Sequence, residues 1–310
     1  MRVIYKKIPF KKINCVATIG VFDGIHLGHK FILKKLRKKA RELNVPSLVI
    51  TFDIPPQILL QKKHKTLKEF PGFLTNLKDK ACYLSKEGID YVWFLKTNNA
   101  LFGLSGRQFL DYLFRYFTVK HFILGKDFRF GHNGSANIRY LKKISKHYGF
   151  RITILKKIEK TGNTVSSSLI RQLIKKSRFK KVENLLGRRF YIEGRVIKGL
   201  GNGTKLGYPT INIDYGGYVI PQEGVYAACV EIDKKKYLSA ASIGVRATVV
   251  ESREKILEAH ILNFKGNILE KKVRISFIKK LRNQRKFSSV KELKISIAKD
   301  VSCIKKHFRV

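Results

Sequence analysis

The feature that most constrains the fold of this chain is a change of pattern near residue 188. Before it, apolar runs of strand length alternate with segments of helical periodicity. After it, short strand-like runs follow one another between turns rich in Gly, Asn, Asp and Lys. Alternating strands and helices predict a parallel, doubly wound sheet, whereas a succession of short strands predicts an antiparallel barrel or sandwich. The 310 residues suffice for two such domains.

In the first half, strands are expected at residues 13–20, 45–53, 89–95, 120–125 and 150–158, and helices at 29–44, 74–88, 105–117 and 138–149. The first of these helices carries apolar residues at helical spacing, namely Ile32, Leu33, Leu36, Ala40 and Leu43. Ligands of a doubly wound sheet bind beyond the carboxyl ends of its strands. Functional residues are therefore expected in the turns that follow the strands.

In the second half, strands are expected at residues 189–199, 224–232, 235–245, 257–264 and 271–281, followed by a helix within 288–308 that begins at a serine N-cap. The change of pattern places the boundary within residues 179–187. The predicted domains are residues 1–182 and 183–310, and the predicted fold class is α/β followed by β.

The charge of the chain is extreme, because 65 Lys and Arg face 22 Asp and Glu and leave a net charge of +43. Basic runs occur throughout, for example at 34–41, 62–65, 175–181 and 234–236. A basic patch for a specific nucleic acid is normally clustered, so the even spread favours a compositional bias on an ordinary enzyme. A basic nucleic-acid-binding protein on an enzyme scaffold stays open as an alternative. In both cases the charge should attract polyanions non-specifically, including phosphorylated substrates.

Targeting signals and cysteine usage favour a cytoplasmic location. The first 14 residues contain neither an apolar core of a signal peptide nor a cleavage site. No stretch approaches the roughly 18 apolar residues of a membrane span. The four cysteines lie far apart without a CxxC pair, which predicts reduced thiols with neither disulfides nor a zinc site.

The stretch GVFDGIHLGH, residues 20–29, lies between an expected strand and an expected helix. Its glycines allow tight turns and close approach of a phosphate, and a helix N-terminus offers unpaired N–H groups. His26 and His29 are three residues apart, so both would project from the same side of the first helical turn. Either histidine alone is more often structural, but the pair in this setting favours a phosphate site. Zinc is a weaker option, because further ligands are not evident.

Three motifs carry a resemblance to a known family. GVFDGIHLGH resembles the HxGH signature of nucleotidyltransferases in the form found in bacterial FAD synthetases. LGKDFRFGHNG at 124–134 and VSSSLIRQLI at 165–174 resemble the next two motifs of that family, in the family's order. LLGRRFYIEGRVIKGLGNGTKLGYPTIN at 185–212 is similar to the opening of the riboflavin kinase module. The whole chain therefore resembles the bifunctional riboflavin kinase/FMN adenylyltransferase family.

This resemblance implies a Rossmann-like nucleotidyltransferase domain followed by an antiparallel Greek-key β-barrel with a terminal helix. It implies two reactions. The barrel would convert riboflavin and MgATP to FMN and ADP, and the first domain would convert FMN and MgATP to FAD and pyrophosphate. Riboflavin, FMN and ATP would be its ligands and Mg2+ its cofactor.

For FAD formation, the resemblance assigns ATP phosphate contacts to His26 and His29 and pyrophosphate binding to Arg171. Its further nucleotide-binding positions are Gly20, Phe22, Asp23, Gly24, Asp127, Ser167 and Ser168. Some of these residues have equally simple structural explanations. Asp23 is expected to fix the turn, the serines to cap a helix, and Asp127 to fix its loop as readily as to bind nucleotide.

For FMN formation, the glycine-rich loop that contains Gly201 and Gly203 would cradle phosphates with its backbone N–H groups. Thr210 and Asn212 would offer oxygen ligands to Mg2+ and the ATP phosphates. The riboflavin hydroxyl must lose a proton as it attacks phosphorus, and Glu258 matches the family's catalytic glutamate. The alternative for Glu258 is an ordinary strand residue on the surface.

Several residues depart from the family pattern. Pro55 stands in TFDIPP where the family usually has histidine, so this chain lacks that histidine near the substrate pocket. In the second half, Ala247 replaces Pro, Leu269-Glu270 replaces Tyr-Gly, and Gln284 replaces Glu. These changes leave a second alternative open, an FMN adenylyltransferase with a degenerate kinase-like barrel that only binds flavin.

Overall fold

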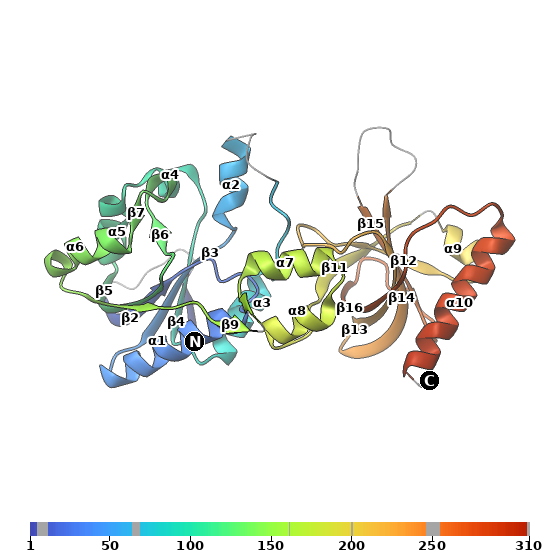
Figure 1. Ribbon diagram of the computed structural model, residues 1–310, viewed down its shortest axis with the longest axis horizontal. Coiled ribbons are helices and arrows are strands. Elements are labelled where there is room, and N and C mark those ends of the chain that lie inside the picture. The colour runs from blue at the N-terminus through green and yellow to red at the C-terminus, as the bar shows by residue number, and fades with distance from the viewer. Residues whose placement is uncertain (5–11, 64–68, 161, 200, 246–254, 309–310) are drawn as a thin grey trace. The chain divides into compact units, whose positions relative to one another are not determined.

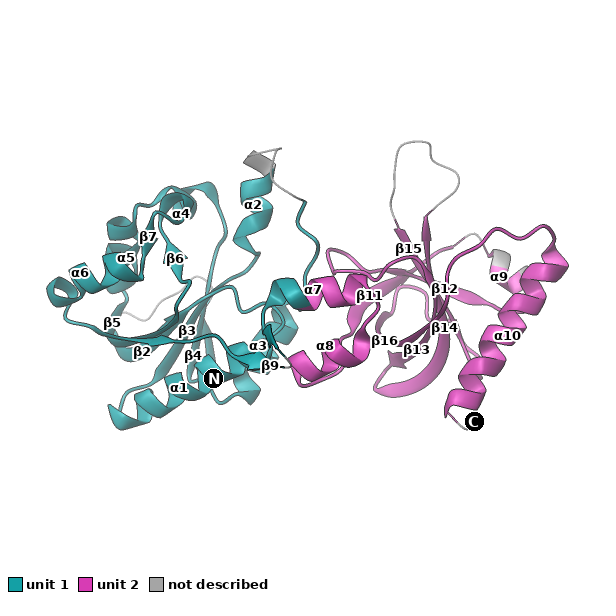
Figure 2. Ribbon diagram, viewed as in Figure 1, with its two compact units in different colours: residues 1–169 teal, residues 170–310 magenta. Residues whose placement is uncertain are grey.

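The computed structural model describes residues 1–4, 12–63, 69–160, 162–199, 201–245 and 255–308 (Figure 1). The chain forms two compact units, residues 1–169 and 170–310 (Figure 2). They divide inside helix α7 (Ser167–Lys175), which is earlier than the domain boundary expected between residues 182 and 183. That boundary stays a prediction, because compact units and functional modules need not divide at the same residue.

The first unit is built on a six-stranded sheet in which every neighbouring pair is parallel, in the order β1-β4-β3-β2-β5-β8. Its strands are β1 (Arg2–Ile4), β2 (Ile13–Ile19), β3 (Ser47–Phe52), β4 (Tyr91–Leu95), β5 (Phe117–Gly125) and β8 (Arg151–Leu155). The strand order reverses at β2, because β3 and β5 lie on opposite sides of it. A ligand crevice is expected beyond the carboxyl ends of strands at such a reversal. The Rossmann-like prediction is confirmed.

Helices cover both faces of this sheet (Figure 1). They are α1 (Leu27–Glu42), α2 (Pro56–Lys63), α3 (Leu77–Lys86), α4 (Asn99–Gly103), α5 (Gly106–Phe114), α6 (Ile138–Tyr148) and the start of α7. One apolar cluster joins Leu33 of α1 and Leu84 of α3 to the sheet, and the other joins Leu113 of α5 and Leu141 of α6 to it. Leu43, expected on the apolar face of α1, is exposed because the helix ends at Glu42.

The sequence did not predict the smaller elements of this unit. They are the edge strand β1, helices α2 and α4, the hairpin of β6 (Arg129–Phe130) and β7 (Ala136–Asn137), the 3-10 turn η1 (His132–Gly134), and the hairpin of β9 (Glu159–Lys160) and β10 (Asn163–Thr164). The strands and the 3-10 turn have only two or three residues and leave no periodic signal. Helices α4, with five residues, and α2, with eight, lack a clear apolar face.

The second unit contains a closed antiparallel barrel in the order β11-β12-β15-β14-β13-β16. Its strands are β11 (Ile192–Ile197), β12 (Thr210–Asp214), β13 (Gly224–Ile232), β14 (Lys235–Val245), β15 (Lys255–Ile261) and β16 (Lys272–Arg282). The neighbours β16, β13, β14 and β15 show the 4-1-2-3 order of a Greek key. The barrel is therefore confirmed, and the sandwich is excluded.

Among the described residues of the second unit, the barrel is accompanied by the end of α7 and by α8 (Phe179–Leu186), α9 (Asn202–Lys205) and α10 (Val290–Phe308). Ser289 caps α10 as expected, since its Oγ accepts a hydrogen bond from the Glu292 N–H at 3.2 Å. Phe179 of α8 stacks on Phe277 of β16 at 5.6 Å between ring centroids. None of the helices in the described ranges is long and apolar enough to cross a membrane.

Candidate active sites

The first unit has a cavity of about 300 Å³ where β2, β5 and β8 end. Its lining combines the turn after β2, the turn after β5, the segment after β8 and the start of α7. The lining residues that matter below are Gly20, Phe22, His26, Gly28, His29, Lys126, Asp127, Lys156, Lys157 and Ser167. The cavity therefore lies at the strand-order reversal where the topology predicts a ligand.

The turn after β2 is held from behind by buried polar groups. Phe22, Gly24 and Ile25 have φ of +49°, +87° and +40°, so three residues of the turn have positive φ. The carboxylate of Asp23 accepts hydrogen bonds from the N–H groups of Leu74 and Thr75 at 3.1 Å, and Gly24 N–H donates to Thr75 Oγ1 at 2.7 Å. Asp23 does not line the cavity. Its observed contacts are those of a turn-fixing residue.

His26 is the N-cap of α1, and its ring orientation follows from that position. Its Nδ1 accepts a hydrogen bond from the backbone N–H of His29 at 3.3 Å. In a neutral imidazole the proton must then reside on Nε2, which makes Nε2 the donor. A Cβ on Gly28 would lie 3.1 Å from the His26 ring, which is tighter than most real Cβ contacts and favours glycine at this position.

His29 stacks on His26 with ring centroids 3.7 Å apart. Its Nδ1 is buried and has no hydrogen-bond partner among the described residues. A buried polar atom without a partner is rare and marks a place where a ligand can bond. Burial, and then the charges of His26 and Lys80, lower the pKa of His29 well below 6.5, which keeps it neutral at pH 7.

The lining also includes the lysines Lys126, Lys156 and Lys157, which follow β5 and β8. Asp127 forms an ion pair with Lys157, whose ammonium lowers the pKa of the Asp127 carboxyl. Sequence reasoning named Asp127 and missed all three lysines. The basic run after β8 was an available signal, because it follows a strand of the parallel sheet.

The three serines at the start of α7 differ in their contacts and exposure. Ser166 Oγ accepts a hydrogen bond from Leu169 N–H at 3.2 Å and caps the helix. Ser167 lines the cavity and donates from Oγ to the Asp23 carbonyl at 2.8 Å. Ser168 is exposed, and neither Ser168 nor Arg171 lines the cavity. The roles expected for Ser168 and Arg171 stay predictions.

The second unit has a cavity of about 260 Å³ at one end of the barrel. All the residues expected for the kinase line it, namely Gly201, Gly203, Thr210, Asn212 and Glu258. Leu206, Tyr208, Ser242, His260, Arg282, Gln284, Phe287, Leu293, Ile297 and Asp300 contribute to the same lining. The structure thus gathers in one place the five residues that the sequence singled out across 58 positions.

Strand register explains how these residues meet. Glu258 of β15 is paired with Asn212 of β12 on one side and with Ser242 of β14 on the other. Directly paired residues point to the same face of the sheet, so the three side chains form a row. Thr210 is paired in the same way with His260, whose Nδ1 hydrogen-bonds the Pro209 carbonyl at 2.8 Å.

Glycines let the loop before β12 approach this row. A Cβ on Gly199 would lie 2.0 Å from Asn212 Nδ2. A Cβ on Gly203 would lie 2.5 Å from the Tyr208 carbonyl oxygen and 2.9 Å from Thr210 Oγ1. All three distances are shorter than real Cβ contacts, and the one to the Tyr208 backbone oxygen cannot be relieved by moving a side chain alone, so the close approach at Gly203 favours glycine.

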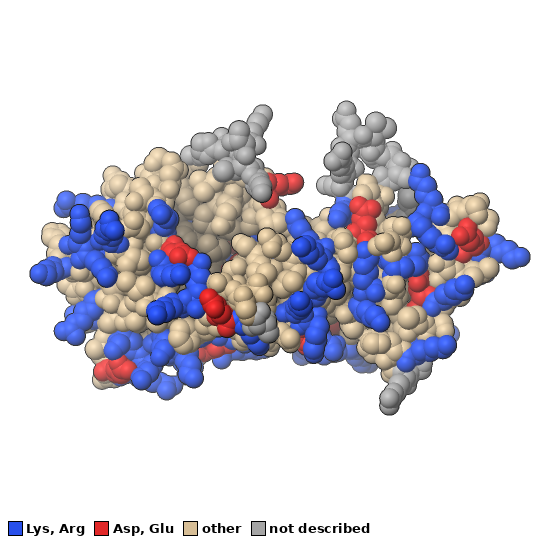
Figure 3. All heavy atoms as spheres, in the orientation of Figure 1, with Lys and Arg blue, Asp and Glu red and all other residues tan. Residues whose placement is uncertain are grey.

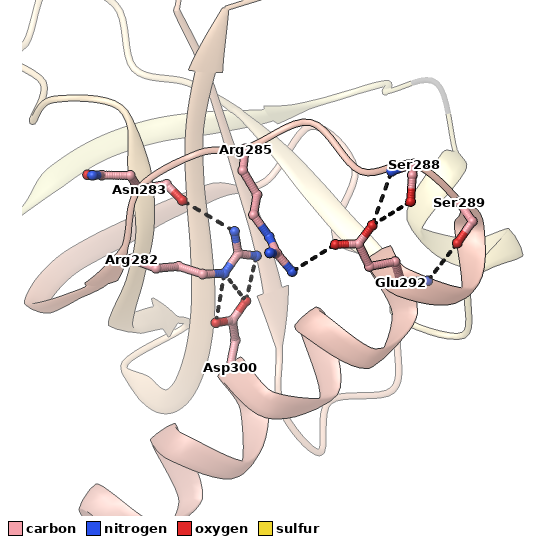
Figure 4. Close-up of polar contacts among 7 residues, drawn as sticks. All are labelled: Arg282, Asn283, Arg285, Ser288, Ser289, Glu292 and Asp300. Atoms are coloured by element: carbon pink, nitrogen blue, oxygen red, sulfur yellow. Dashed lines mark hydrogen bonds and ion pairs between the residues drawn. The ribbon is translucent and has the colours of Figure 1, made fainter.

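The helix α10 is tied to the barrel beside this cavity (Figure 4). Arg282 Nη2 lies 2.8 Å from Asp300 Oδ2, and its Nε lies 3.1 Å from both carboxylate oxygens. Arg285 Nη2 lies 3.2 Å from Glu292 Oε1, which also belongs to α10. These pairs hold the Leu293 side of α10 against the cavity.

The departures from the family pattern have different structural settings. Gln284 lines the kinase cavity and donates from Nε2 to Ser242 Oγ at 2.6 Å and to the Ile243 carbonyl at 3.3 Å. Glu270 has φ +66°, where glycine is the favoured residue, and pairs with Arg195 at 2.7 Å.

Two further departures lie away from the lining residues. Pro55 stands before α2, where its carbonyl accepts from Ile58 N–H at 3.1 Å, and it does not line the first cavity. Leu269 is 47% exposed. Ala247 lies outside the described residues.

The donor sets of the two cavities differ in what they can hold. The described residues contain no group of three or more His, Cys, Asp or Glu side chains placed to bind a metal. In the second cavity Thr210, Asn212 and Glu258 present oxygen atoms, and hard oxygen donors completed by ATP phosphates and water suit Mg2+. These residues therefore fit a nucleotide-bound magnesium ion.

Comparison with known families assigns each unit to a class of transferase. Residues 9–169 match the family model of FAD synthetase, and residues 186–308 match that of riboflavin kinase. Residues 170–185, which contain most of α7 and α8, lie between the two matches. The two cavities fall within the two matched ranges.

The relatives combine both classes in one chain. The chain is 36% identical over 306 residues to the bifunctional riboflavin kinase/FMN adenylyltransferase of Buchnera aphidicola from Schizaphis graminum, covering 97% of this chain and 96% of the relative. The enzymes of the same name from Pseudomonas fluorescens and Escherichia coli K12 are 37% and 35% identical, over 93% of this chain and 91% and 90% of theirs. The chain belongs to the bifunctional riboflavin kinase/FMN adenylyltransferase family.

A solved structure resembles the chain over nearly its full length. It is described as a macrolide-efflux protein from Streptococcus pneumoniae, is 26% identical, and superposes with a TM-score of 0.83 over 98% of both chains. The efflux activity in that description concerns the other protein. The likeness supports the two-unit fold described above.

Proposed function

We infer that this chain converts riboflavin to FMN in its barrel and FMN to FAD in its first unit. The observation that carries this function is the agreement of family and geometry in both halves. Each family match contains a cavity, and the residues expected from its motifs largely line that cavity. All five expected kinase residues lie together, which favours an active barrel over a degenerate one.

In FAD formation the phosphate of FMN would attack the α-phosphorus of ATP, form a new P–O bond and release pyrophosphate. A phosphate is already a nucleophile, so the protein needs no strong base. We propose that His26 and His29 donate hydrogen bonds to the ATP phosphates. The lysines around Asp127 would balance the negative charge that passes to pyrophosphate. Magnesium bound with ATP would neutralise part of the same charge.

In FMN formation the hydroxyl of riboflavin would attack the γ-phosphorus of ATP and release ADP. An alcohol must lose its proton in this step, and a carboxylate in the cavity can accept it. We propose that Glu258 is this base. Asn212 and Thr210 would bind the nucleotide-bound magnesium ion from the adjacent strand, while the loop at Gly201 and Gly203 covers the phosphates.

A product assay tests this function. Purified protein with riboflavin, ATP and Mg2+ should form FMN first and FAD afterwards, as separated by liquid chromatography. A second reaction started from FMN should form FAD and pyrophosphate without a lag. Formation of FAD from FMN but no FMN from riboflavin would support the alternative of a degenerate barrel. Formation of neither product across a range of Mg2+ concentrations would contradict the whole proposal.

The charge of +43 suggests binding of polyanions but does not define a specific nucleic-acid surface. On the face in view, Lys and Arg side chains are scattered over both units and interspersed with acidic ones (Figure 3). We propose that nucleic acids bind non-specifically, in competition with phosphorylated substrates. Retention of RNA should fall steeply as salt rises. Tight sequence-selective retention at physiological salt would favour the nucleic-acid alternative.

A cytoplasmic location stays a prediction.

A further inference from the structure

We propose that Lys80 is a positioning residue for FAD formation, which clamps the ends of β2 and β3 and so holds the histidine turn in shape. Lys80 lies on α3 and is only 3% exposed. Its Nζ donates to the Val21 carbonyl and to the Phe52 carbonyl, both at 3.1 Å. Val21 belongs to the turn after β2, and Phe52 is the last residue of β3. One ammonium group thus connects the carboxyl ends of two neighbouring strands.

A buried ammonium group is costly and is normally retained only where charged partners and hydrogen bonds compensate for it. Asp23 and Asp53 are the partners here. Burial lowers the pKa of Lys80 to about 8, against the opposing effect of these two carboxylates. Lys80 is therefore mostly protonated at pH 7 and loses its charge above pH 8. A neutral apolar side chain would fill the space without bonding to either carbonyl.

The clamp acts on the part of the turn that carries the catalytic histidines. Val21 precedes Phe22, which is held at φ +49° and whose ring lies 4.9 Å from that of His29. Behind the same turn, Asp23 is bonded to the loop at Leu74 and Thr75, directly before α3. Lys80 and Asp23 thus both connect the turn to α3 and the loop before it, and neither residue lines the cavity.

The charge of Lys80 also reaches His29, whose pKa is lowered first by burial and then by His26 and Lys80. The charged or titratable groups around the histidine turn are His26 on α1, Lys80 on α3, Asp23 and Asp53 beside Lys80, and Lys126, Asp127, Lys156 and Lys157 in the cavity lining. Removing the ammonium should therefore raise the pKa of His29, while the burial effect remains.

The inference rests on the proposed FAD-forming activity, and the experiment separates the two. Lys80→Met keeps the length of the side chain but removes its charge and donors, and Lys86→Met does the same at an exposed site on the same helix. Riboflavin phosphorylation in the same protein reports whether the chain is folded and active elsewhere. If neither the parent nor Lys86→Met formed FAD from FMN, the proposed function would fail before Lys80 was tested.

We expect Lys80→Met to lower kcat for FAD formation by about tenfold or more, because the histidines lose their alignment. KM for ATP and the rate of FMN formation should change by less than about threefold. The NMR titration midpoint of His29 should move upward. Lys80→Met with the FAD-forming rate and His29 midpoint of Lys86→Met would overturn the inference.

A pH profile keeps the inference testable if Lys80→Met does not fold. In the parent, kcat for FAD formation should fall as pH rises above about 8, where Lys80 loses its proton. In Lys80→Arg the guanidinium stays charged, so the decline should move to higher pH even if the maximum rate is lower. Identical alkaline limbs in the parent and in Lys80→Arg would overturn the inference.

Discussion

The two cavities of this chain differ in charge, and the difference follows the nucleophile that each must serve. Around the first, two histidines and three lysines face a single carboxylate, Asp127, which is already paired with Lys157. Around the second, Glu258 stands in a row with the neutral side chains of Asn212 and Ser242. The phosphate of FMN needs only positioning and charge balance, whereas the hydroxyl of riboflavin needs a base. We therefore expect catalysis in the second cavity to depend on a carboxylate, and catalysis in the first cavity to depend on cations and hydrogen-bond donors.

Replacement of His29 by alanine tests the first half of this comparison and should have the largest effect. FAD formation from FMN should fall by about 100-fold or more, because a preorganised donor to the phosphates is lost. FMN formation should stay within about twofold of the parent, since His29 belongs to the first unit and does not line the barrel cavity. His147→Ala, at an exposed position on α6, is the matched control. Chromatography of both products measures the effect, and equal loss of both activities in a folded variant would contradict separate sites.

Replacement of Glu258 by glutamine tests the other half. Loss of a general base should lower FMN formation by about 100-fold or more while adenylylation of supplied FMN continues. The control is Glu270→Gln, which changes an exposed carboxylate on the same unit. A normal rate of FMN formation in Glu258→Gln would show that Glu258 is not the base and would remove the contrast.

Gly203→Ala should have a smaller effect, confined to the kinase. A Cβ would lie 2.5 Å from the Tyr208 carbonyl, so the loop must move away from Thr210. We expect KM for ATP in FMN formation to rise about tenfold, which corresponds to roughly 1.4 kcal/mol of binding free energy. Steady-state kinetics of both reactions measure this effect. Gly103→Ala is the control, because a Cβ there meets nothing within 4 Å. An unchanged KM for ATP in Gly203→Ala would show that the loop does not contribute to nucleotide binding.

Gln284→Glu should have the smallest effect and asks whether Gln284 weakens the barrel. The new carboxylate could accept from Ser242 Oγ but could no longer donate to the Ile243 carbonyl. If Glu258 alone is the base, the rate of FMN formation should change by less than about threefold. A rise of about tenfold or more in that rate would show that glutamine at position 284 weakens the kinase.

Local patterns in the sequence predicted much of this arrangement. The strand and the helix within residues 13–42 follow from apolar runs and helical spacing, whereas the N-cap role of His26 emerged only from the structure. The ranges of β13 and β14 match the expected ones to the residue, because Asp233 and Lys234 form a turn with positive φ between two apolar runs. The HxGH turn and Glu258 could be singled out because the residues next to them in the sequence form motifs.

Contacts between distant segments could not be predicted in this way. Lys80 reaches the Val21 carbonyl across 59 positions, and nothing near Lys80 in the sequence distinguishes it from the other lysines. Lys126 and Lys157 line the same cavity only because β5 and β8 are neighbours in the sheet. Strand β12 follows the glycine-rich loop directly and was not predicted. Its pairing with β15 places Asn212 next to Glu258.

The central claim is that two independent sites act in succession, and a mixing experiment tests it most directly. His29→Ala should convert riboflavin to FMN and stop there, and Glu258→Gln should form FAD only from supplied FMN. Mixed together with riboflavin, ATP and Mg2+, the two variants should form FAD, because FMN released by one is a substrate of the other. A mixture that forms no FAD, while each variant keeps its own remaining activity, would contradict independent sites joined by free FMN.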